Sequence, residues 1–164
     1  MNKKYLIWLS RIENLGTKKI LNLLSTYSLE QLWNLTESEL KRIPGIGQET
    51  AKKIRDDKYR NNLDKYLEYM EKNQIQILNL QDQSYPKNLK NIYDPPFVLY
   101  VKGNLQILNE FSLGIIGCRA YSEYGKETAL RFSYELSQSG INIISGLAKR
   151  SRYIFSSGLF KRKI

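Results

Sequence analysis

The spacing of apolar residues changes once along this chain, near Lys72, and this change constrains the fold more than any other feature. Before it, as in residues 6–27, apolar residues recur every three or four positions, which is the period of an amphipathic helix. After it, apolar residues alternate with polar ones at residues 75–80 and form a short run at residues 97–101, with turn residues between them, which is typical of strands. The sequence therefore predicts a helical region followed by an α/β region.

A turn with two glycines joins two predicted helices. One short helix closes at residues 38–42, Gly45 and Gly47 form the turn, and the next helix begins at Gln48. Glycine permits a tight turn and lets backbone N–H groups approach a phosphate beside the positive end of a helix. Lys52 lies about one turn further along and is placed for a second phosphate contact. The pattern indicates a helix-hairpin-helix motif; a plain connection between packed helices stays open as the alternative.

The helical region forms one predicted domain. Residues 15–19 look like a degenerate first half of a tandem pair, so residues 1–57 are expected to form a small all-helical domain. Residues 58–72 then predict a charged, tyrosine-rich helix whose charges form a solvated face. With the strand at residues 75–80, this helix makes a connecting segment, residues 58–80.

The last part of the chain predicts a strand, a helix and a strand. The strands are expected at residues 113–117 and 141–144, with a helix between them at about residues 124–139. A unit of this kind is expected to be parallel and right-handed. The inner face of the helix is predicted to hold Ala129, Leu130, Phe132 and Leu136.

Two loops follow these predicted strands, at the edge where α/β units bind ligands. The first loop contains Gly117, Cys118, Arg119, Tyr121 and Ser122, and the second contains Ser145, Gly146 and Lys149. Both combine small residues, hydroxyls and a cation, which suits a phosphate. For Gly117 and Gly146, ordinary turn geometry is the competing interpretation. The first loop is not a GxGxxG motif, so it does not indicate a dinucleotide.

Composition excludes several kinds of site. The chain has no histidine and a single cysteine, which rules out a Ser-His triad, an internal disulfide and a structural zinc site. No metal or cofactor is indicated. The net charge is +10, but from Lys149 onward there are six basic and no acidic residues, so the rest carries only about +4. The apolar runs are too short to span a bilayer, and a cytoplasmic protein without membrane contact is expected.

A long string of residues carries a resemblance to a known family. The string comprises Tyr85, Pro86, Leu89, Ile92, Asp94, Pro95, Pro96, Val98, Leu99, Tyr100, Lys102 and Gly103, then Ile116, Gly117, Arg119, Ser122, Tyr124, Gly125, Ser145, Gly146, Leu147 and Ala148. It closely resembles the DprA/Smf family of DNA-processing proteins, and residues 1–57 resemble the sterile-alpha-motif-like (SAM-like) N-terminal domain of that family. The resemblance covers residues 1–149.

The resemblance implies a function that the residues alone do not establish. It implies that residues 81–149 begin a Rossmann-like, doubly wound parallel sheet that binds single-stranded DNA in a basic pocket, without a cofactor and without enzymatic activity. Family members dimerise, protect incoming DNA and load the RecA recombinase during natural transformation. The family's loop arginine corresponds to Arg119 and its second basic position to Lys149, while Cys118 stands where the family usually has Ser or Thr.

Aromatic residues beside the first loop have two interpretations. Tyr121 and Tyr124 could stack on bases, as aromatic residues do in proteins that bind single strands. They could instead pack against the start of the helix, and for Tyr124 packing is the favoured interpretation.

Two other functions compete with DNA binding. A Rossmann-type nucleotide hydrolase would need an acid or base; Glu123 and Glu127 are available, but glutamates at a helix N-terminus more often interact with the helix dipole. The helical domain could also act alone as a protein-contact or duplex-contact module. Binding to single strands, with a steep salt dependence, separates the first function from these two.

Residues 150–164 depart from the family pattern. After Lys149 the family continues with glycine, an aliphatic residue and aspartate, then histidine and glycine. Deleting one adenine from a permitted back-translation at Lys149 restores all of these positions, so we expect a frameshift after about residue 149. A chain cut there lacks the remaining strands and the dimer interface of the family, and a non-functional fragment stays open as an outcome.

Overall fold

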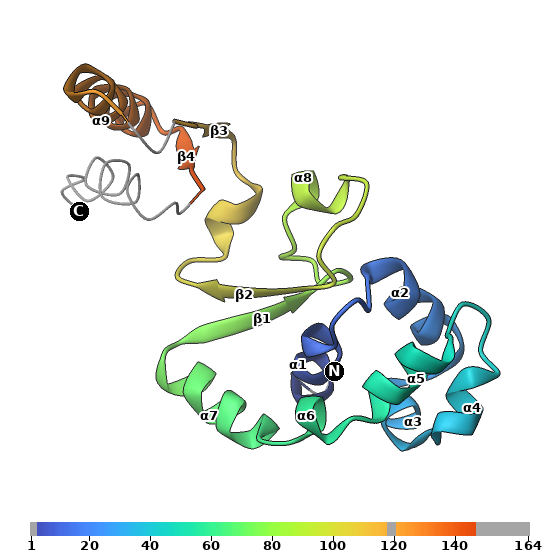
Figure 1. Ribbon diagram of the computed structural model, residues 1–164. Helices are drawn as coiled ribbons and strands as arrows, with labels where there is room; N and C mark the ends of the chain where they lie inside the picture. The colour runs from blue at the N-terminus through green and yellow to red at the C-terminus, as the bar shows by residue number, and fades with distance from the viewer. Residues whose placement is uncertain (1–2, 118–120, 147–164) are drawn as a thin grey trace. The chain divides into compact units, whose positions relative to one another are not determined.

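The computed structural model describes residues 3–117 and 121–146. The chain divides into two compact units, Met1–Asn109 and Glu110–Ile164 (Figure 1). Residues 150–164, for which the sequence predicts a shifted reading frame, lie outside the described residues.

Helices make up most of the first unit. Their bounds are α1 Lys3–Arg11, α2 Thr17–Thr26, α3 Leu29–Asn34, α4 Glu37–Lys41, α5 Gln48–Arg55, α6 Asp57–Arg60 and α7 Leu63–Lys72. Capping boxes start two of the short ones: Ser28 Oγ accepts a hydrogen bond from the Gln31 N–H, and Thr36 caps α4 in the same way. These caps satisfy N–H groups that a helix end otherwise leaves unpaired.

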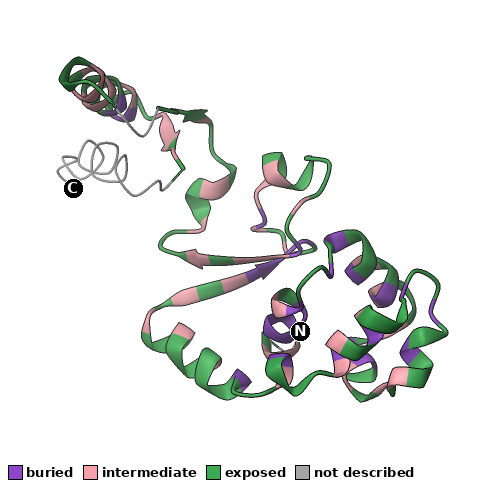
Figure 2. Cartoon of the chain, in the orientation of Figure 1, coloured by how far each residue is buried: buried purple, intermediate pink, exposed green. Residues whose placement is uncertain are grey.

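The core of the first unit lies between these helices. Figure 2 shows buried residues concentrated on them. Trp8 of α1, Leu40 of α4, and Ala51 and Ile54 of α5 are almost completely buried. The apolar spacing read from the sequence therefore corresponds to the buried faces of the helices.

The helix predicted at residues 58–72 is interrupted in the structure. Asn62 has a φ of 61°, in the left-handed region, and serves as the N-cap of α7. Asparagine tolerates this backbone conformation better than most residues, so the chain bends here. The prediction of one continuous helix is wrong, and α6 and α7 replace it.

Two strands complete the first unit. β1 (Ile75–Asn79) pairs antiparallel with β2 (Val98–Lys102), with Ile75 opposite Lys102 and Asn79 opposite Val98. The connection between them contains the short helix α8 (Lys87–Lys90), and a 3₁₀ turn, η1 (Gln106–Asn109), follows β2.

Two hydrogen bonds fix the connection between β1 and β2. The buried Tyr85 hydroxyl donates to the carbonyl of Pro96 at 2.6 Å, and Thr17 Oγ1 donates to the carbonyl of Pro95 at the same distance. Thr17 begins α2, so the second bond joins the connection to the helices. The first compact unit therefore reaches Asn109 and includes residues that the sequence analysis assigned to the connecting segment and to the α/β domain.

The second unit contains a strand–helix–strand arrangement. β3 (Ser112–Gly114) pairs in parallel with β4 (Asn142–Ile144), and α9 (Glu123–Gln138) connects them and packs against β4. The predicted parallel pairing is confirmed. Each strand has three residues, fewer than predicted. The doubly wound sheet expected from the family extends beyond this pair and stays a prediction.

Burial along α9 differs from the prediction. Ser133 and Ser137, four residues apart on one helical face, are the buried residues of α9, whereas Phe132 is 49% exposed. Small serine side chains let that face approach its neighbours closely, while Ala129, Leu130 and Leu136 of the predicted face are half-buried. Phe132 lines a pocket with Ala129 and Leu136 beside β3, so it lies on the predicted inner face but is not buried there. The buried strand predicted to end at Ile144 leaves that residue exposed. Within residues 3–117 and 121–146, no helix combines the length and apolarity needed to cross a membrane.

Candidate nucleic-acid interface

The carboxyl ends of β3 and β4 lie at one edge of the second unit. The strands are parallel, with Gly114 opposite Ile144, and the N–H of Ile115 donates to the carbonyl of Ile144 at 2.9 Å. Gly117 follows β3, and Ser145 and Gly146 follow β4 directly. The pairing therefore brings together the described parts of the two loops at the edge where α/β units bind ligands.

The N-terminus of α9 follows the first loop. Ser122 is the N-cap, and its Oγ accepts a hydrogen bond from the N–H of Gly125 at 3.1 Å. The Ser122 hydroxyl keeps its own proton for donation to an anion. A helix of 16 residues also presents a partial positive charge at this end.

Side chains beside this edge are open to solvent. Tyr124 is 77% exposed, so the interpretation that it packs at the helix start is wrong. Tyr121, Gly117 and Gly146 are exposed as well, and Ser145 is half-buried. Both cations predicted for the site, Arg119 and Lys149, lie outside the described residues.

The acidic residue nearest the start of α9 is engaged in an ion pair. Lys126 Nζ donates a hydrogen bond to Glu123 Oε2 at 3.0 Å, and this bond raises the pKa of the Lys126 ammonium. A carboxylate paired on the helix surface is poorly placed to act as a general acid or base. Over residues 3–117 and 121–146, no cluster of three or more histidine, cysteine, aspartate or glutamate side chains could hold a metal ion.

The glycine turn of the first unit has the predicted form in part. Gly45 has a φ of +84°, which a residue with a side chain rarely adopts. Gly47, in contrast, has an extended backbone and is the N-cap of α5. Glycine offers no side chain to cap the first-turn N–H groups of α5, which leaves them available to solvent or to an anion.

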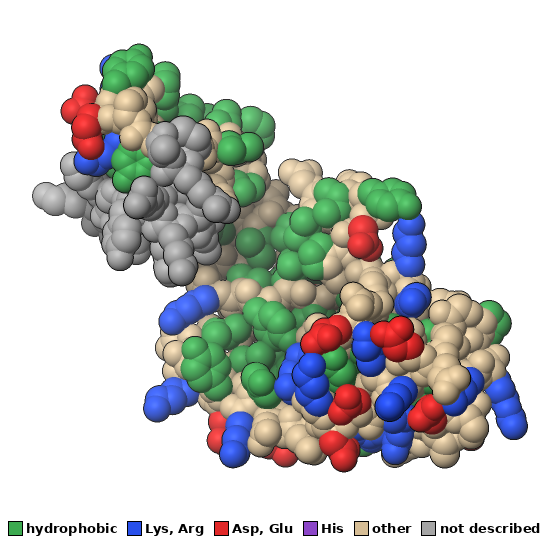
Figure 3. Space-filling view, viewed as in Figure 1, with side chains coloured by type: hydrophobic (Ala, Val, Ile, Leu, Met, Phe, Trp, Pro, Cys, Tyr) green, Lys and Arg blue, Asp and Glu red, His purple; other side chains and the backbone are tan. Residues whose placement is uncertain are grey.

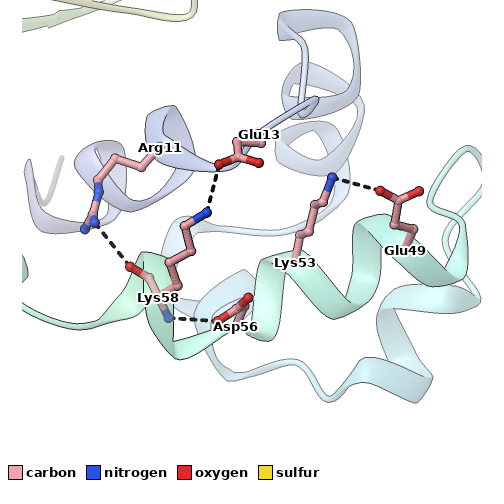
Figure 4. Close-up of polar contacts among 6 residues, drawn as sticks. All are labelled: Arg11, Glu13, Glu49, Lys53, Asp56 and Lys58. Atoms are coloured by element: carbon pink, nitrogen blue, oxygen red, sulfur yellow. Dashed lines mark hydrogen bonds and ion pairs between the residues drawn. The ribbon is translucent and has the colours of Figure 1, made fainter.

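The two lysines of α5 differ in their partners. Lys53 Nζ lies 2.8 Å from Glu49 Oε1 (Figure 4), and this hydrogen bond lowers the pKa of Glu49 and raises that of Lys53. Lys52 is exposed and makes no ion pair with any described residue. Of the two lysines, Lys52 is therefore the one whose charge is available to a polyanion.

A second group of contacts in Figure 4 holds α6 against α1 and the turn after α1. Lys58 Nζ lies 2.8 Å from Glu13 Oε1, the Lys58 N–H donates to Asp56 Oδ1 at 2.8 Å, and Arg11 donates to the Lys58 carbonyl at 3.2 Å. These contacts join α6, which follows α5 directly, to α1 and the turn after it. The degenerate first turn, residues 15–19, is less open, since Thr17 is buried and bonded to Pro95.

Comparison with known proteins assigns the chain to a family. Residues 76–150 match the family described as DNA recombination-mediator protein A, and residues 8–57 match a SAM-like helix-hairpin-helix tandem. The chain belongs to the DprA/Smf family. The second match bears out the helix-hairpin-helix prediction for the N-terminal helices.

Two DprA/Smf relatives and one solved structure illustrate the similarity. The chain is 29% identical to protein Smf of Borreliella burgdorferi over 87% of its own length and 45% of the relative's. It is 30% identical to the DNA processing protein DprA of Bacillus subtilis, over 79% of the chain and 46% of the relative. The crystal structure of DprA from Streptococcus pneumoniae matches 96% of the chain and 54% of that protein, with a TM-score of 0.66 and 25% identity. The chain thus spans about half the length of the relatives that it matches.

Proposed function

We propose that this DprA/Smf chain binds single-stranded DNA at the carboxyl edge of β3 and β4. The DNA backbone is bound by Gly117, Arg119, Tyr121 and Ser122 of the first loop and by Ser145, Gly146 and Lys149 of the second. The observation that supports the proposal is the parallel pairing of β3 with β4, because the carboxyl ends of the two strands, from which the loops continue, lie at the same edge.

The chemistry of the edge supports a phosphate ligand. Exposed glycines allow close approach of the backbone, the Ser122 hydroxyl donates, and the α9 N-terminus adds partial positive charge. Arg119 and Lys149 supply the full charges in this proposal, as phosphate contacts do in other nucleic-acid interfaces. The exposed rings of Tyr121 and Tyr124 are available for stacking on unpaired bases.

The proposal describes a binding protein and not an enzyme. Its support is the absence of histidine from the sequence and the pairing of Glu123 with Lys126. Following the family resemblance, we infer further that β3, α9 and β4 begin a Rossmann-like sheet. We also infer a cytoplasmic full-length protein that dimerises, protects DNA and loads RecA during natural transformation.

A binding experiment with one variant tests the proposal. Fluorescence anisotropy measures the affinity of the chain for a labelled oligothymidine and for a duplex of equal length. We expect tighter binding to the single strand. We expect Arg119→Ala to weaken this binding by about tenfold or more, since a charge-assisted hydrogen bond contributes roughly 1.5–3 kcal/mol. Arg131→Ala on α9 removes an equal charge away from the loops and is the matched control.

If Arg119→Ala binds the single strand as tightly as the wild type does, the proposed site is wrong. If Arg119→Ala and Arg131→Ala lose the same affinity for oligothymidine, the binding depends on total charge and not on a site at Arg119.

A secondary DNA contact is proposed at Gly45, Gly47 and Lys52. Lys52 makes no ion pair with a described residue, and no side chain caps the first-turn N–H groups of α5, so both could interact with a phosphate. Lys52→Ala should then weaken duplex binding by several fold. Lys53→Ala, which removes a lysine already paired with Glu49, should have less effect. Equal effects of the two substitutions would remove the secondary contact.

A further inference from the structure

A groove of about 850 Å³ opens on the first unit, away from the predicted helix-hairpin-helix turn. It is bounded by α1, by α7 and its N-cap, and by β1 and β2. The residues that line it are Ile7, Arg11, Asn62, Lys65, Tyr66, Tyr69, Met70, Ile75 and Tyr100. Figure 3 shows hydrophobic side chains gathered on this face of the first unit, with lysine and arginine side chains beside them. The volume lies within the range of roughly 300–1,000 Å³ that is usual for small-molecule sites.

Three tyrosines give the groove its aromatic character. Tyr66 and Tyr69 lie three residues apart on α7, and Tyr100 comes from β2. The guanidinium of Arg11 lies 4.3 Å from the centre of the Tyr66 ring, and the Tyr100 hydroxyl is hydrogen-bonded to Ser10. Tyr66 and Tyr100 are therefore held in place. All three rings remain more than a third exposed, although large aromatic side chains are usually more deeply buried.

The charge of the lining is positive. Arg11 and Lys65 are its charged residues, and no carboxylate is among the side chains that line it. Arg11 donates to the backbone carbonyls of Lys58, Tyr59 and Asn61, which are neutral groups. Neither Arg11 nor Lys65 makes an ion pair with another side chain in the described part of the chain, so no carboxylate there neutralises either charge.

We propose that this groove binds unstacked bases of single-stranded DNA, with Tyr66, Tyr69 and Tyr100 as stacking surfaces and Arg11 and Lys65 beside the phosphates. Aromatic rings combined with cations form the chemistry by which proteins hold single strands without reading their sequence. An acidic peptide would use the cations but would leave the three exposed rings without a matching partner. The inference rests on the proposed function, because it takes single-stranded DNA as the ligand and assigns it a second site.

A strand without bases separates stacking from electrostatic attraction. Tyr69 is 60% exposed, so Tyr69→Ala should leave the fold intact, as checked by circular dichroism. We expect it to weaken binding of oligothymidine about fivefold or more, the lower limit for loss of one stacked base. Binding of an abasic strand of equal length should not change, and Tyr69→Phe should bind oligothymidine as well as the wild type does. Tyr93→Ala removes an 87% exposed tyrosine outside the groove and is the matched control.

Each alternative result is decisive. Three results would overturn the groove as a base-binding site. Tyr69→Ala could bind oligothymidine as tightly as the wild type does, or it could lose as much affinity for the abasic strand as for oligothymidine. Tyr93→Ala could also lose as much affinity for oligothymidine as Tyr69→Ala does. If Tyr69→Ala weakens binding while Arg119→Ala does not, the groove stands and the loop site fails. If only Arg119→Ala weakens binding, the loop site stands and the groove fails. A wild-type chain that does not bind the single strand overturns both.

Discussion

Lys58 Nζ lies 2.8 Å from Glu13 Oε1, which joins α6 to the turn after α1 across 45 positions of the sequence. The hydrogen bond and the positive charge of Lys58 lower the pKa of Glu13, and Glu13 in turn raises the pKa of Lys58. The pair is exposed to solvent, so its contribution to stability is expected to be small and to decrease with salt.

Glu13→Gln should make the stability of the chain less dependent on pH. A carboxyl whose pKa is lowered in the folded state stabilises the fold above its unfolded pKa, near 4.5, and this contribution is lost as the pH falls through the folded pKa. The difference in urea midpoint between wild type and variant should therefore be largest near neutral pH and should vanish in acid. Glu68→Gln, on α7, is the control; a difference that persists unchanged in acid would contradict the assignment.

Gly45→Ala should destabilise the first unit by about 1–2 kcal/mol, because residue 45 has a φ of +84°. Gly45→Asn should cost less, since asparagine tolerates this region of backbone conformation. Thermal unfolding of the two variants measures the difference. Equal stability of Gly45→Ala and the wild type would show that the turn does not require a left-handed residue.

Tyr85→Phe should cost about 1–2 kcal/mol. The Tyr85 hydroxyl is buried, donates to the Pro96 carbonyl at 2.6 Å, and has a pKa raised by that burial. Removing it leaves the carbonyl of Pro96 without this partner. Urea unfolding measures the loss, and Tyr93→Phe, at an exposed tyrosine, should leave stability unchanged. A loss of similar size in both variants would contradict this role for the hydroxyl.

Local signals in the sequence predicted several elements well. The helix predicted to begin at Gln48 does so as α5, because the glycine turn that ends at Gly47 marks its start. The parallel pairing of β3 with β4 followed from the strand–helix–strand order. α3 was missed, although Ser28 and Gln31 have the spacing of the capping box that starts it.

Features that depend on tertiary contacts were not predicted. The antiparallel pairing of β1 with β2 spans a long connection without a hairpin signal, so periodicity alone did not reveal it. The pairing of Lys53 with Glu49, in contrast, has the local i,i+4 spacing of a helix, and the sequence analysis did not use that signal to separate Lys53 from Lys52. Likewise the groove joins Tyr66 and Tyr69 to Tyr100, about thirty residues away in the sequence. The spacing of the two helical tyrosines was the only local signal, and the charges of that segment indicated a solvated face.

The salt dependence of single-strand binding tests the central claim most directly. For oligothymidine, each phosphate contact adds about 0.7 to the slope of log affinity against log salt concentration. If Arg119 contacts a phosphate at the edge of β3 and β4, Arg119→Ala should have a slope smaller by about 0.7 than both the wild type and Arg131→Ala. An unchanged slope in Arg119→Ala, or an equal reduction in Arg131→Ala, would contradict single-strand binding at this edge.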